Sequence, residues 1–520
     1  MPTKQTAGLH LHNTLTKKKE PFISIDEEKK KTLRLTPRSH SELAQGENSS
    51  RGIVLMYTCG PTVYGRPHIG NYASFLMADL LRRWLEVSGY EVIHAKNITD
   101  VGHLLHDADQ GDDKVQKQAE REKLHPLEIA RRYETEFLDD ERALNMLEPA
   151  YRPRASEYVK QMLTLVKKLL ENGHAYEAND GIYFSVESFP AYGALSGNTL
   201  ENLSAGARVE VKEEKKHPAD FALWKKCVGG NGAHILRWSY ATGEVSNTEG
   251  EDSDSGFPGW HIECSAMSSS LLGEQIDIHT GGEDNIFPHH ECEIAQSEAS
   301  SGQKPFVKYW VHRRRIQMGE EKMSKSLGNV LSLPDVIHEG FSPLDLRYYL
   351  LSVHYRTNLK FAIKGLEDAK KARRKIVEWM EEMGGKESKE GKESEEGKES
   401  EEGVIAGWHE KFFDAMNNDL NTSSALAVVF DFMTWSRNQT GWSQNALKAL
   451  HQLIDDIRRT FGCFESEEMD VSAKVLQLLT KRKEARQAKD YHLSDKLREE
   501  IRKEGYEVRD VGDEQELIPL

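Results

Sequence analysis

The sequence lacks the features of a membrane or secreted protein. No apolar run approaches the ~20 residues that a membrane-spanning helix needs. The first twenty residues contain neither the apolar stretch of a signal peptide nor the arginine-rich pattern of a transit peptide. Cysteine is scarce, with five widely separated residues in a chain of 520, which excludes a disulfide scaffold. We therefore expect a cytoplasmic globular protein with no membrane partner and roughly three or four domains.

The net charge of −16 gives no sign of a nucleic-acid partner. Much of the acid lies in EVSNTEGEDSDS (244–255) and in three hexapeptide repeats (385–402), and both segments are predicted to be unstructured. Basic residues cluster elsewhere, as HRRR (312–315), KKARRK (370–375) and KRKEARQAK (481–489). Such clusters are common on exposed helix faces, so by themselves they do not predict RNA binding.

A strand–loop–helix–strand unit is predicted over residues 52–98. The apolar run GIVLMYTC (52–59) ends at Gly60-Pro61, as a buried strand would. Apolar residues then recur every three or four positions from Tyr72 to Leu85, which is the spacing of an amphipathic helix, and YEVIHAKNI predicts the second strand. Such units build an α/β fold with a parallel sheet, whose ligand binds at the carboxyl ends of the strands.

The second half of this sheet is expected after a long insertion. QIDIHTGGEDNIFPHHECEIAQS (275–297) again predicts a strand, a glycine turn and a helix, and GIYFSV (181–186) predicts a strand of a separate module. Residues 404–465 predict amphipathic helices, one of them capped by Asn421 or Thr422. The last fifty residues predict a charged helix pair and a tail.

Two separated motifs together predict an ATP site. The turn that contains His68, Gly70 and Asn71 opens a predicted helix, where backbone N–H groups and the positive helix end favour an anion. Far downstream, KMSKS (322–326) offers Lys322 and Lys325, a cation pair suited to a leaving pyrophosphate. Each motif alone could be an ordinary loop, but the pair is far less common by chance.

A metal site is a second prediction. His289 and Glu293 are four positions apart on a predicted helix and share a face. Two cysteines that follow predicted strands complete a tetrahedral zinc set of Cys59, Cys264, His289 and Glu293. Cys292 and His290 are rival ligands, which we interpret as core or supporting residues. Spacing alone leaves the metal site open, because no two ligands have the compact CxxC arrangement.

The chain resembles the class I aminoacyl-tRNA synthetases and, within that class, the cysteinyl-tRNA synthetases. The resemblance is carried in order by YTCGPTVY, NITDV, FALWK, GFPGWHIECSAM, DIHTGGEDNIFPHHECEIAQS, EKMSKSLGN, LRYYLLSVHYRTNL and DLNTSSAL, and it runs to ARQAKDYHLSDKLREEI near the end. It implies a Rossmann-type catalytic domain split by a connective insertion, then a helical bundle and a small anticodon-binding module. The expected division is 1–125 and 257–310 for the two catalytic halves, 126–256 for the insertion, 311–365 for a stem-contact segment, 366–470 for the bundle and 471–520 for the module.

The resemblance also implies the site residues and partners. It assigns one zinc to Cys59, Cys264, His289 and Glu293, and it assigns Thr99, Trp260 and His279 to the pocket for L-cysteine. Asp284 is expected to face the adenosine, and Lys325 is the expected ATP lysine. His68, Asn71, Lys322 and Lys325 are the implied catalytic residues. Mg²⁺ with ATP and tRNA(Cys) are also implied. The sequence carries no signal for the oligomeric state, and we expect a monomer.

The sequence departs from the family pattern in a few places. Asn71 stands where the family usually has histidine, and it can donate a hydrogen bond but carries no charge. Residues 26–50, 227–256 and the repeats at 385–402 are interpreted as insertions.

Three alternative functions remain open at this level. One is a ligase that joins activated cysteine to an amino-sugar, against which residues 404–520 argue. The second is a synthetase-like RNA-binding protein without activity, which Asn71 slightly favours. The third is a nucleotide-binding protein with a structural zinc, which would contain metal but show no dependence on cysteine.

Overall fold

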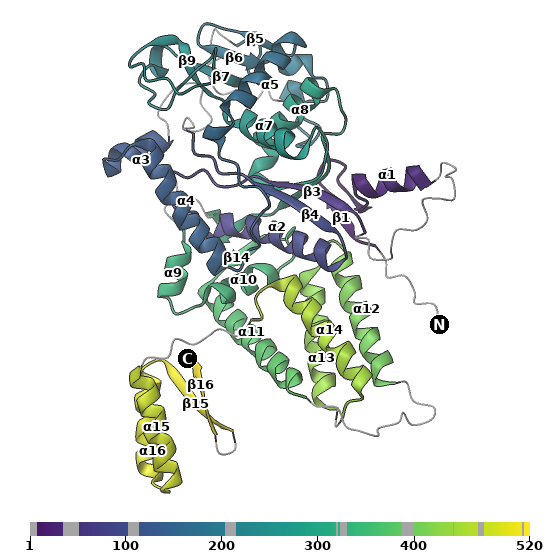
Figure 1. Cartoon of the computed structure of the whole chain (residues 1–520), viewed down its shortest axis with the longest axis vertical. Coiled ribbons are helices and arrows are strands. Elements are labelled where there is room, and N and C mark those ends of the chain that lie inside the picture. Colours follow the sequence, from purple (N-terminus) through teal and green to yellow (C-terminus); the bar gives the residue numbers. More distant parts are fainter. Residues whose placement is uncertain are drawn as a thin grey trace, which may run out of the picture. The chain divides into compact units, whose positions relative to one another are not determined.

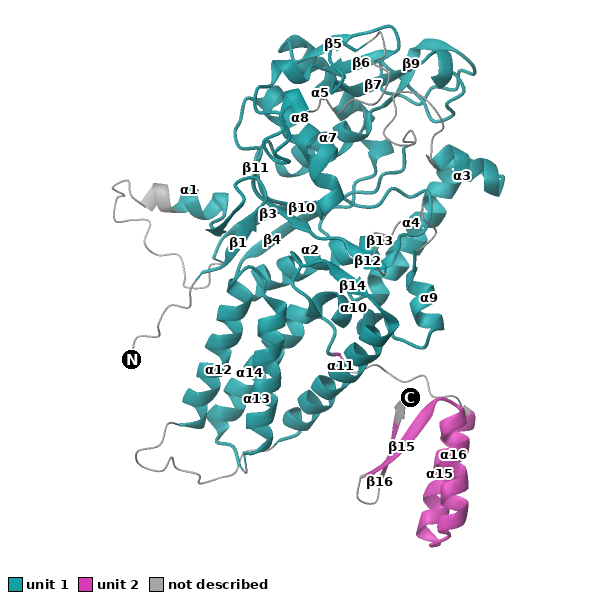
Figure 2. Ribbon diagram, turned by 180° about the vertical axis from the view of Figure 1, so that it is seen from behind, with its two compact units in different colours: residues 1–464 teal, residues 465–520 magenta. Residues whose placement is uncertain are grey.

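The computed structural model describes residues 8–34, 51–101, 114–202, 215–318, 321–322, 330–386, 400–439, 441–465, 473–511 and 514–519. The chain divides into two compact units, Met1–Phe464 and Glu465–Leu520 (Figure 2). Each unit is described by itself below.

A four-stranded parallel sheet is the centre of the first unit. Its strand order is β11 (Val307–Arg313), β10 (Ile276–Gly282), β3 (Ile53–Thr58) and β4 (Glu91–Lys96). Helix α2 (Ile69–Val87) connects β3 to β4. The predicted strand–loop–helix–strand unit is therefore confirmed, and so is the return of the chain to the same sheet at β10.

The insertion between β4 and β10 carries a sheet of its own. Its antiparallel order is β5 (Ala175–Glu177), β6 (Gly181–Phe184), β7 (Phe221–Cys227), β9 (Asp252–Pro258) and β8 (Trp238–Ser239). The helices that precede or follow it are α3 (Lys114–Glu122), α4 (Pro126–Ala143), α5 (Val159–Glu171) and α7 (Trp260–Leu272). Strand β6 confirms the strand expected at 181–186. The expectation that 244–255 is wholly unstructured is wrong, because β9 begins at Asp252 and Ser255 is only 2% exposed.

Two hydrophobic cores lie on the two faces of the parallel sheet. Side chains alternate along each strand, so Val54 and Met56 of β3 enter one core and Tyr57 enters the other. The first core includes α2 and the helices formed between residues 343 and 461. The second core includes α5, α7 and α8 (Glu291–Ser301). Figure 1 shows α2 on one side of the sheet and α7 and α8 on the other.

Short strands and helices follow the parallel sheet. They are β12 (Ile316–Met318), β13 (Glu321–Lys322), α9 (Leu333–His338), α10 (Pro343–Ser352), β14 (Leu359–Phe361) and α11 (Ile363–Gly384). At the start of the chain, β1 (His10–Asn13) pairs with β2 (Lys18–Pro21), and α1 (Ile25–Arg34) occupies part of the expected insertion at 26–50.

The predicted amphipathic helices are confirmed as α12 (Glu401–Asn417), α13 (Thr422–Arg437) and α14 (Gln444–Phe461). The Asn421 side chain accepts a hydrogen bond from the Ser424 N–H, so Asn421 is the cap of α13. Most of the hexapeptide repeat lies outside the described residues. The expectation that the whole repeat is unstructured is wrong at its end, because Glu401 and Glu402 form the first turn of α12 after the N-cap Ser400.

A buried ionic hub joins α2 to α10 and α14. Asp79 of α2 accepts hydrogen bonds from Arg347 of α10 at 2.5 Å and from Arg83 at 2.8 Å. The Arg347 guanidinium also donates to the carbonyl of Phe461 at 2.6 Å and to that of Leu144 at 2.9 Å. One carboxylate thus pairs with two guanidinium groups, and backbone carbonyls accept further hydrogen bonds of Arg347, so each of these buried charges has partners.

The second unit is a helix pair with a β-hairpin. Helices α15 (Ala473–Gln487) and α16 (Tyr491–Lys503) confirm the predicted pair, and β15 (Tyr506–Val511) pairs with β16 (Glu514–Pro519). The hairpin was not predicted, because its alternation contains many charged residues. Its small core consists of Val475, Ile501, Val508 and Leu517.

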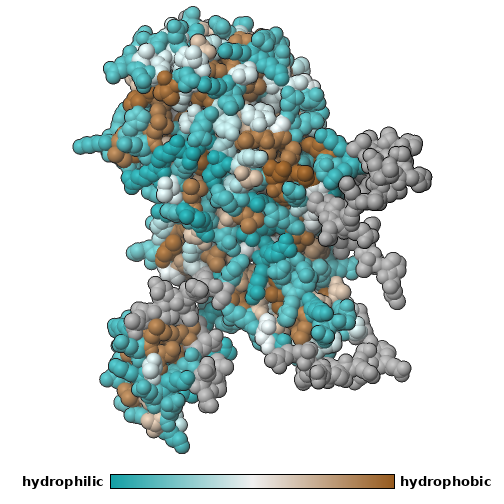
Figure 3. All heavy atoms as spheres, in the orientation of Figure 1, coloured by the Kyte–Doolittle hydropathy of each residue, from teal (hydrophilic) through white to brown (hydrophobic). Residues whose placement is uncertain are grey.

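Apolar and polar residues are mixed on the face drawn in Figure 3. Among the described residues, no helix combines the length and the apolar character needed to cross a membrane.

Candidate active site

Four potential metal ligands lie together beside the carboxyl end of β3. Cys59 follows β3, Cys264 lies in the second turn of α7, and His289 comes one helical turn before Glu293 of α8. The Cys59 sulfur lies 3.7 Å from the Cys264 sulfur, 3.4 Å from His289 Nε2 and 3.6 Å from Glu293 Oε1. His289 Nε2 is 3.0 Å from the same carboxylate oxygen. The structure thus brings the four predicted ligands within reach of one ion.

Both cysteines follow strands, as expected, but the two strands belong to different sheets. Strand β9, which precedes Cys264, lies in the antiparallel sheet of the insertion, and Cys264 itself is helical.

The donor set fits zinc. A tetrahedral zinc with ~2.3 Å bonds to sulfur and ~2.0–2.1 Å bonds to nitrogen and oxygen has ligand–ligand edges of roughly 3.3–3.8 Å. The four separations above, from 3.0 to 3.7 Å, are close to these edges. Two sulfurs, one imidazole and one carboxylate are ligand types that zinc accepts.

A second, overlapping group of ligands exists at the same place. It shares Cys59 and Glu293 with the first group but contains His279 of β10 and His290 instead of Cys264 and His289. His290 Nε2 lies 3.4 Å from the Cys59 sulfur, and His279 Nε2 lies 3.0 Å from Glu293 Oε2. The predicted set contains two thiols rather than one, and thiolates are the softer ligands that zinc prefers.

The ionisable groups of the cluster shift one another's pKa values. Burial by itself would raise the pKa of Glu293, but the imidazoles of His279 and His289 lower it to about 2. The hydrogen bond with Cys59 lowers the pKa of Cys264 to about 6, against the effect of burial. Burial by itself would lower the pKa of His289, but Glu293 and Cys264 raise it to about 10. A metal ion that binds here would therefore displace a proton from His289.

Two histidines that the sequence interpretation missed, His261 and His312, contact rings at the cluster. Nδ1 of His261 lies 3.0 Å from Nδ1 of His289, and the Trp260 ring stacks on His289 with centroids 4.7 Å apart. His290 Nδ1 lies 2.7 Å from His312 Nε2. The signal for His261 was its position three residues before Cys264, which places both on one helix face. No comparable spacing indicated His312.

The three residues expected in the cysteine pocket border the same cluster. Trp260 stacks on His289, and His279 contacts Glu293 as described above. The Thr99 hydroxyl donates to Glu263 at 3.1 Å, and Thr99 is 3% exposed.

The predicted phosphate turn is the amino end of α2. His68 is the N-cap, and its Nδ1 accepts from the Asn71 N–H while Asn71 Oδ1 accepts from the His68 N–H. The Ile69 N–H donates to the carbonyl of Leu331 at 2.9 Å, which joins this turn to the chain that follows KMSKS. Gly70 lies in the first turn of the helix.

The structure describes only part of the other residues expected at the ATP site. Asp284 is exposed just after β10, and its carboxylate lies 3.2 Å from the Arg315 guanidinium. Lys322 ends β13, but its side chain is outside the description, and Lys325 lies outside the described residues altogether.

Three family models match successive parts of the chain. The model for class I (C) tRNA synthetase catalytic domains matches residues 45–371, the DALR domain matches 411–481, and the cysteinyl-tRNA ligase anticodon-binding domain matches 468–517. The cysteine–tRNA ligase of Thermus thermophilus is 41% identical over 97% of this chain and 98% of its own length. That of Chlorobaculum tepidum is 38% identical over the same shares of the two chains.

Solved structures share the fold at low identity. Methionyl-tRNA synthetase of Mycobacterium tuberculosis, in complex with methionyl-adenylate, aligns with a TM-score of 0.53 and 13% identity over 79% of this chain and 92% of its own. A LeuRS of Agrobacterium radiobacter K84 aligns with a TM-score of 0.56 and 11% identity over 84% and 86% of the two chains. With full-length relatives at about 40% identity and a split parallel sheet that bears the expected motifs, this chain belongs to the cysteine–tRNA ligase family of class I tRNA synthetases.

Proposed function

We propose that this chain activates L-cysteine with ATP and transfers it to tRNA(Cys). The observation that carries the proposal is the buried cluster of two thiols, an imidazole and a carboxylate at the end of β3, one loop away from the phosphate turn of α2. Membership of the cysteine–tRNA ligase family supports the same activity.

Cys59, Cys264, His289 and Glu293 would hold a zinc ion. When bound, zinc supplies a thiophilic centre that distinguishes the cysteine thiol from the serine hydroxyl. A pocket that selects by shape alone separates such near-isosteres by only about 1–3 kcal/mol. We assign Thr99, Trp260 and His279 to the walls of this pocket, where Trp260 fixes the His289 ring by stacking.

The ATP residues orient the triphosphate for attack by the amino-acid carboxylate at the α-phosphate. His68, Gly70 and Asn71 present the positive amino end of α2 to the phosphates. Lys322 and Lys325 neutralise the leaving pyrophosphate together with Mg²⁺, and Asp284 faces the adenosine. The terminal ribose hydroxyl of the tRNA then attacks the cysteinyl-adenylate, so the two steps need no protein nucleophile.

The cellular setting and the domain roles belong to the same proposal. The five described cysteines are all free, as is usual in a reducing compartment, and we place the protein in the cytoplasm as a monomer. We assign 1–125 and 257–310 to catalysis, 126–256 to the insertion, 311–365 to stem contacts, 366–470 to the bundle and 471–520 to the anticodon.

The test is aminoacylation of transcribed tRNA(Cys) with cysteine and with serine. Wild type should charge cysteine and exclude serine, and Cys264→Ser should lose both bound zinc and cysteine charging. Cys292→Ser is the matched control, because Cys292 is equally buried but contacts the Tyr192 hydroxyl instead of the cluster. Cysteine-dependent pyrophosphate exchange without tRNA charging would instead indicate the amino-sugar ligase. No exchange at all would indicate an inactive RNA-binding protein.

A further inference from the structure

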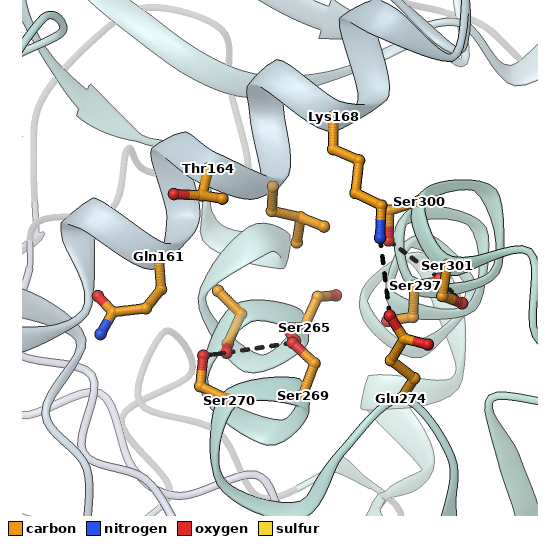
Figure 4. Close-up of a pocket in the computed structure, with 12 residues that line it drawn as sticks. Gln161, Thr164, Lys168, Ser265, Ser269, Ser270, Glu274, Ser297, Ser300 and Ser301 are labelled. Carbon is orange, nitrogen blue, oxygen red and sulfur yellow. Dashed lines mark hydrogen bonds and ion pairs between the residues drawn. The ribbon is translucent and has the colours of Figure 1, made fainter.

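A serine-lined groove lies between helix α5 and the two helices that carry Cys264 and Glu293. Helices α5, α7 and α8 enclose a cavity of about 230 Å³, which has room for roughly seven waters. Figure 4 shows its serines on two facing helices, with α5 above them. The hydroxyl residues that line it are Thr164, Ser265, Ser269, Ser270, Ser297, Ser300 and Ser301.

Four serine hydroxyls of the groove already donate their protons and can only accept a hydrogen bond from a ligand, whereas one serine hydroxyl still has a proton to donate. Ser269 and Ser270 donate to carbonyls of their own helix at 2.7 and 2.6 Å, and Ser300 and Ser301 do the same at 3.1 and 2.7 Å. With their protons used in this way, these oxygens can only accept from a ligand. Ser297 differs, because its Oγ has no hydrogen-bond partner in the described part of the chain although the residue is only 6% exposed.

One basic and one acidic side chain, those of Lys168 of α5 and Glu274, line the groove. Their charged atoms are 3.6 Å apart, with each side chain about half exposed. A surface pair this loose contributes little to stability, so exchanging it for contacts with a ligand costs little. No other charged residue lines the cavity among the described residues.

We propose that this groove binds a small zwitterion, namely a free amino acid with a short side chain, at a site separate from the cysteine pocket. The ammonium group is accepted by Glu274 and by the serine oxygens. The carboxylate takes its hydrogen bonds from Lys168 and from the Ser297 hydroxyl, which satisfies that buried group. A ligand with a single charge would leave one of the two charged residues unmatched.

The groove is connected to the metal cluster through both helices. Ser265 is the residue after Cys264, and Ser297 is one helical turn after Glu293. The Ser265 hydroxyl donates to Gln296 Oε1 at 2.7 Å, which ties α7 to α8 between the two sites. A bound amino acid therefore contacts the same two helices that position the candidate ligands, one residue from Cys264 and one helical turn from Glu293.

The test measures binding rather than catalysis, so its failure would leave the proposed function untouched. Protein is first saturated with a sulfamoyl analogue of cysteinyl-adenylate, because a mimic of the intermediate occupies the cysteine pocket tightly. Titration with L-alanine is then followed by NMR, with propionate and ethylamine as analogues that each lack one charge. We expect saturable binding of alanine and at least about tenfold weaker binding of both analogues.

Variants locate the site. Lys168→Met and Ser297→Ala should each weaken alanine binding by roughly tenfold, and Ser270→Leu should abolish it by filling the groove from an exposed position. Lys167→Met is the matched control, because this neighbouring lysine of α5 lies over the Tyr240 ring and does not line the groove, and it should bind as wild type does. No saturable binding, equal binding of propionate, or binding that survives Ser270→Leu would each overturn the proposal.

Discussion

His289 and Glu293 contact each other through Nε2 and Oε1 at 3.0 Å, across the junction between an irregular turn and helix α8. Residues Ile286–His290 form this turn, and Phe287 in it has extended backbone angles (φ −139°, ψ 134°). The turn directs His289 toward Cys264 and the next residue, His290, toward His312. Two adjacent histidines thereby take different roles around one carboxylate.

The first prediction separates these two roles. His289→Asn should lose the bound zinc, whereas His290→Asn should keep one zinc per chain, since we assign the metal to the set with two thiols. Metal content after gel filtration is the measurement. Loss of zinc from the His290 variant with retention in the His289 variant would assign the metal to the rival set with His279 instead.

Removal of the metal is the second prediction. Chelation should abolish cysteine-dependent pyrophosphate exchange by at least about a hundredfold, because the substrate loses its distinguishing contact. The far-ultraviolet circular dichroism should stay unchanged, since the cluster is a small part of a large core. Added zinc should restore the exchange. Full activity in a preparation shown to be metal-free would contradict the zinc assignment.

The third prediction concerns the phosphate turn. Asn71→Ala removes one half of the reciprocal cap on α2 and should cost about 0.5–2 kcal/mol of unfolding free energy. It should lower the exchange rate less than His68→Ala, because the amide of Asn71 carries no charge with which to stabilise the phosphates. Steady-state exchange kinetics and urea unfolding measure the two effects. An equal loss of rate in both variants would make Asn71 a direct contributor to catalysis.

The fourth prediction tests the buried hub. Arg347→Met leaves Asp79 buried without its main partner and should destabilise the first unit by about 3–5 kcal/mol. Arg374→Met is a matched control, because the pair that Arg374 forms with Glu378 is partly exposed, and the change should alter stability by less than about 0.5 kcal/mol. Urea unfolding compares the two, and similar effects would show that the hub adds no stability.

Acid should weaken the hub, which is the fifth prediction. Burial by itself would raise the pKa of Asp79, but Arg347, then Arg83, and the Leu147 N–H hold it well below its usual range. Its stabilising effect is therefore complete above the unfolded-state pKa of ~3.9 and is lost as the pH falls below that value toward the folded-state pKa. The difference in stability between wild type and Asp79→Asn should be constant from pH 7 to pH 5 and should shrink below pH 4. A difference that does not change with pH would contradict a charged Asp79.

The sequence predicts most of the sheet because its signals are local. The apolar run before Cys59 and the helical spacing after Tyr72 each depend on neighbours within one element. The five-stranded sheet of the insertion was largely missed, because β8 and part of β9 are short, polar and held by partners far away in the chain.

The candidate site was only partly predictable for a related reason. His289 and Glu293 are four residues apart and can be paired on spacing alone. His312 and Arg347 come from distant segments, so their contacts depend on tertiary packing that no short window contains. Resemblance to a family supplied the ligand set, but it did not indicate the hub.

The Arg347 guanidinium has a consequence for dissecting the chain into smaller pieces. It binds the carbonyl of Phe461 at the end of α14, although it belongs to α10 and also holds Asp79 of α2. A shortened protein that stops before α12 would expose this arginine's surroundings to water and strip the first core of the helices that cover it. The catalytic sheet and the helical bundle therefore depend on each other for folding. A shortened enzyme of this kind must extend to at least Phe464.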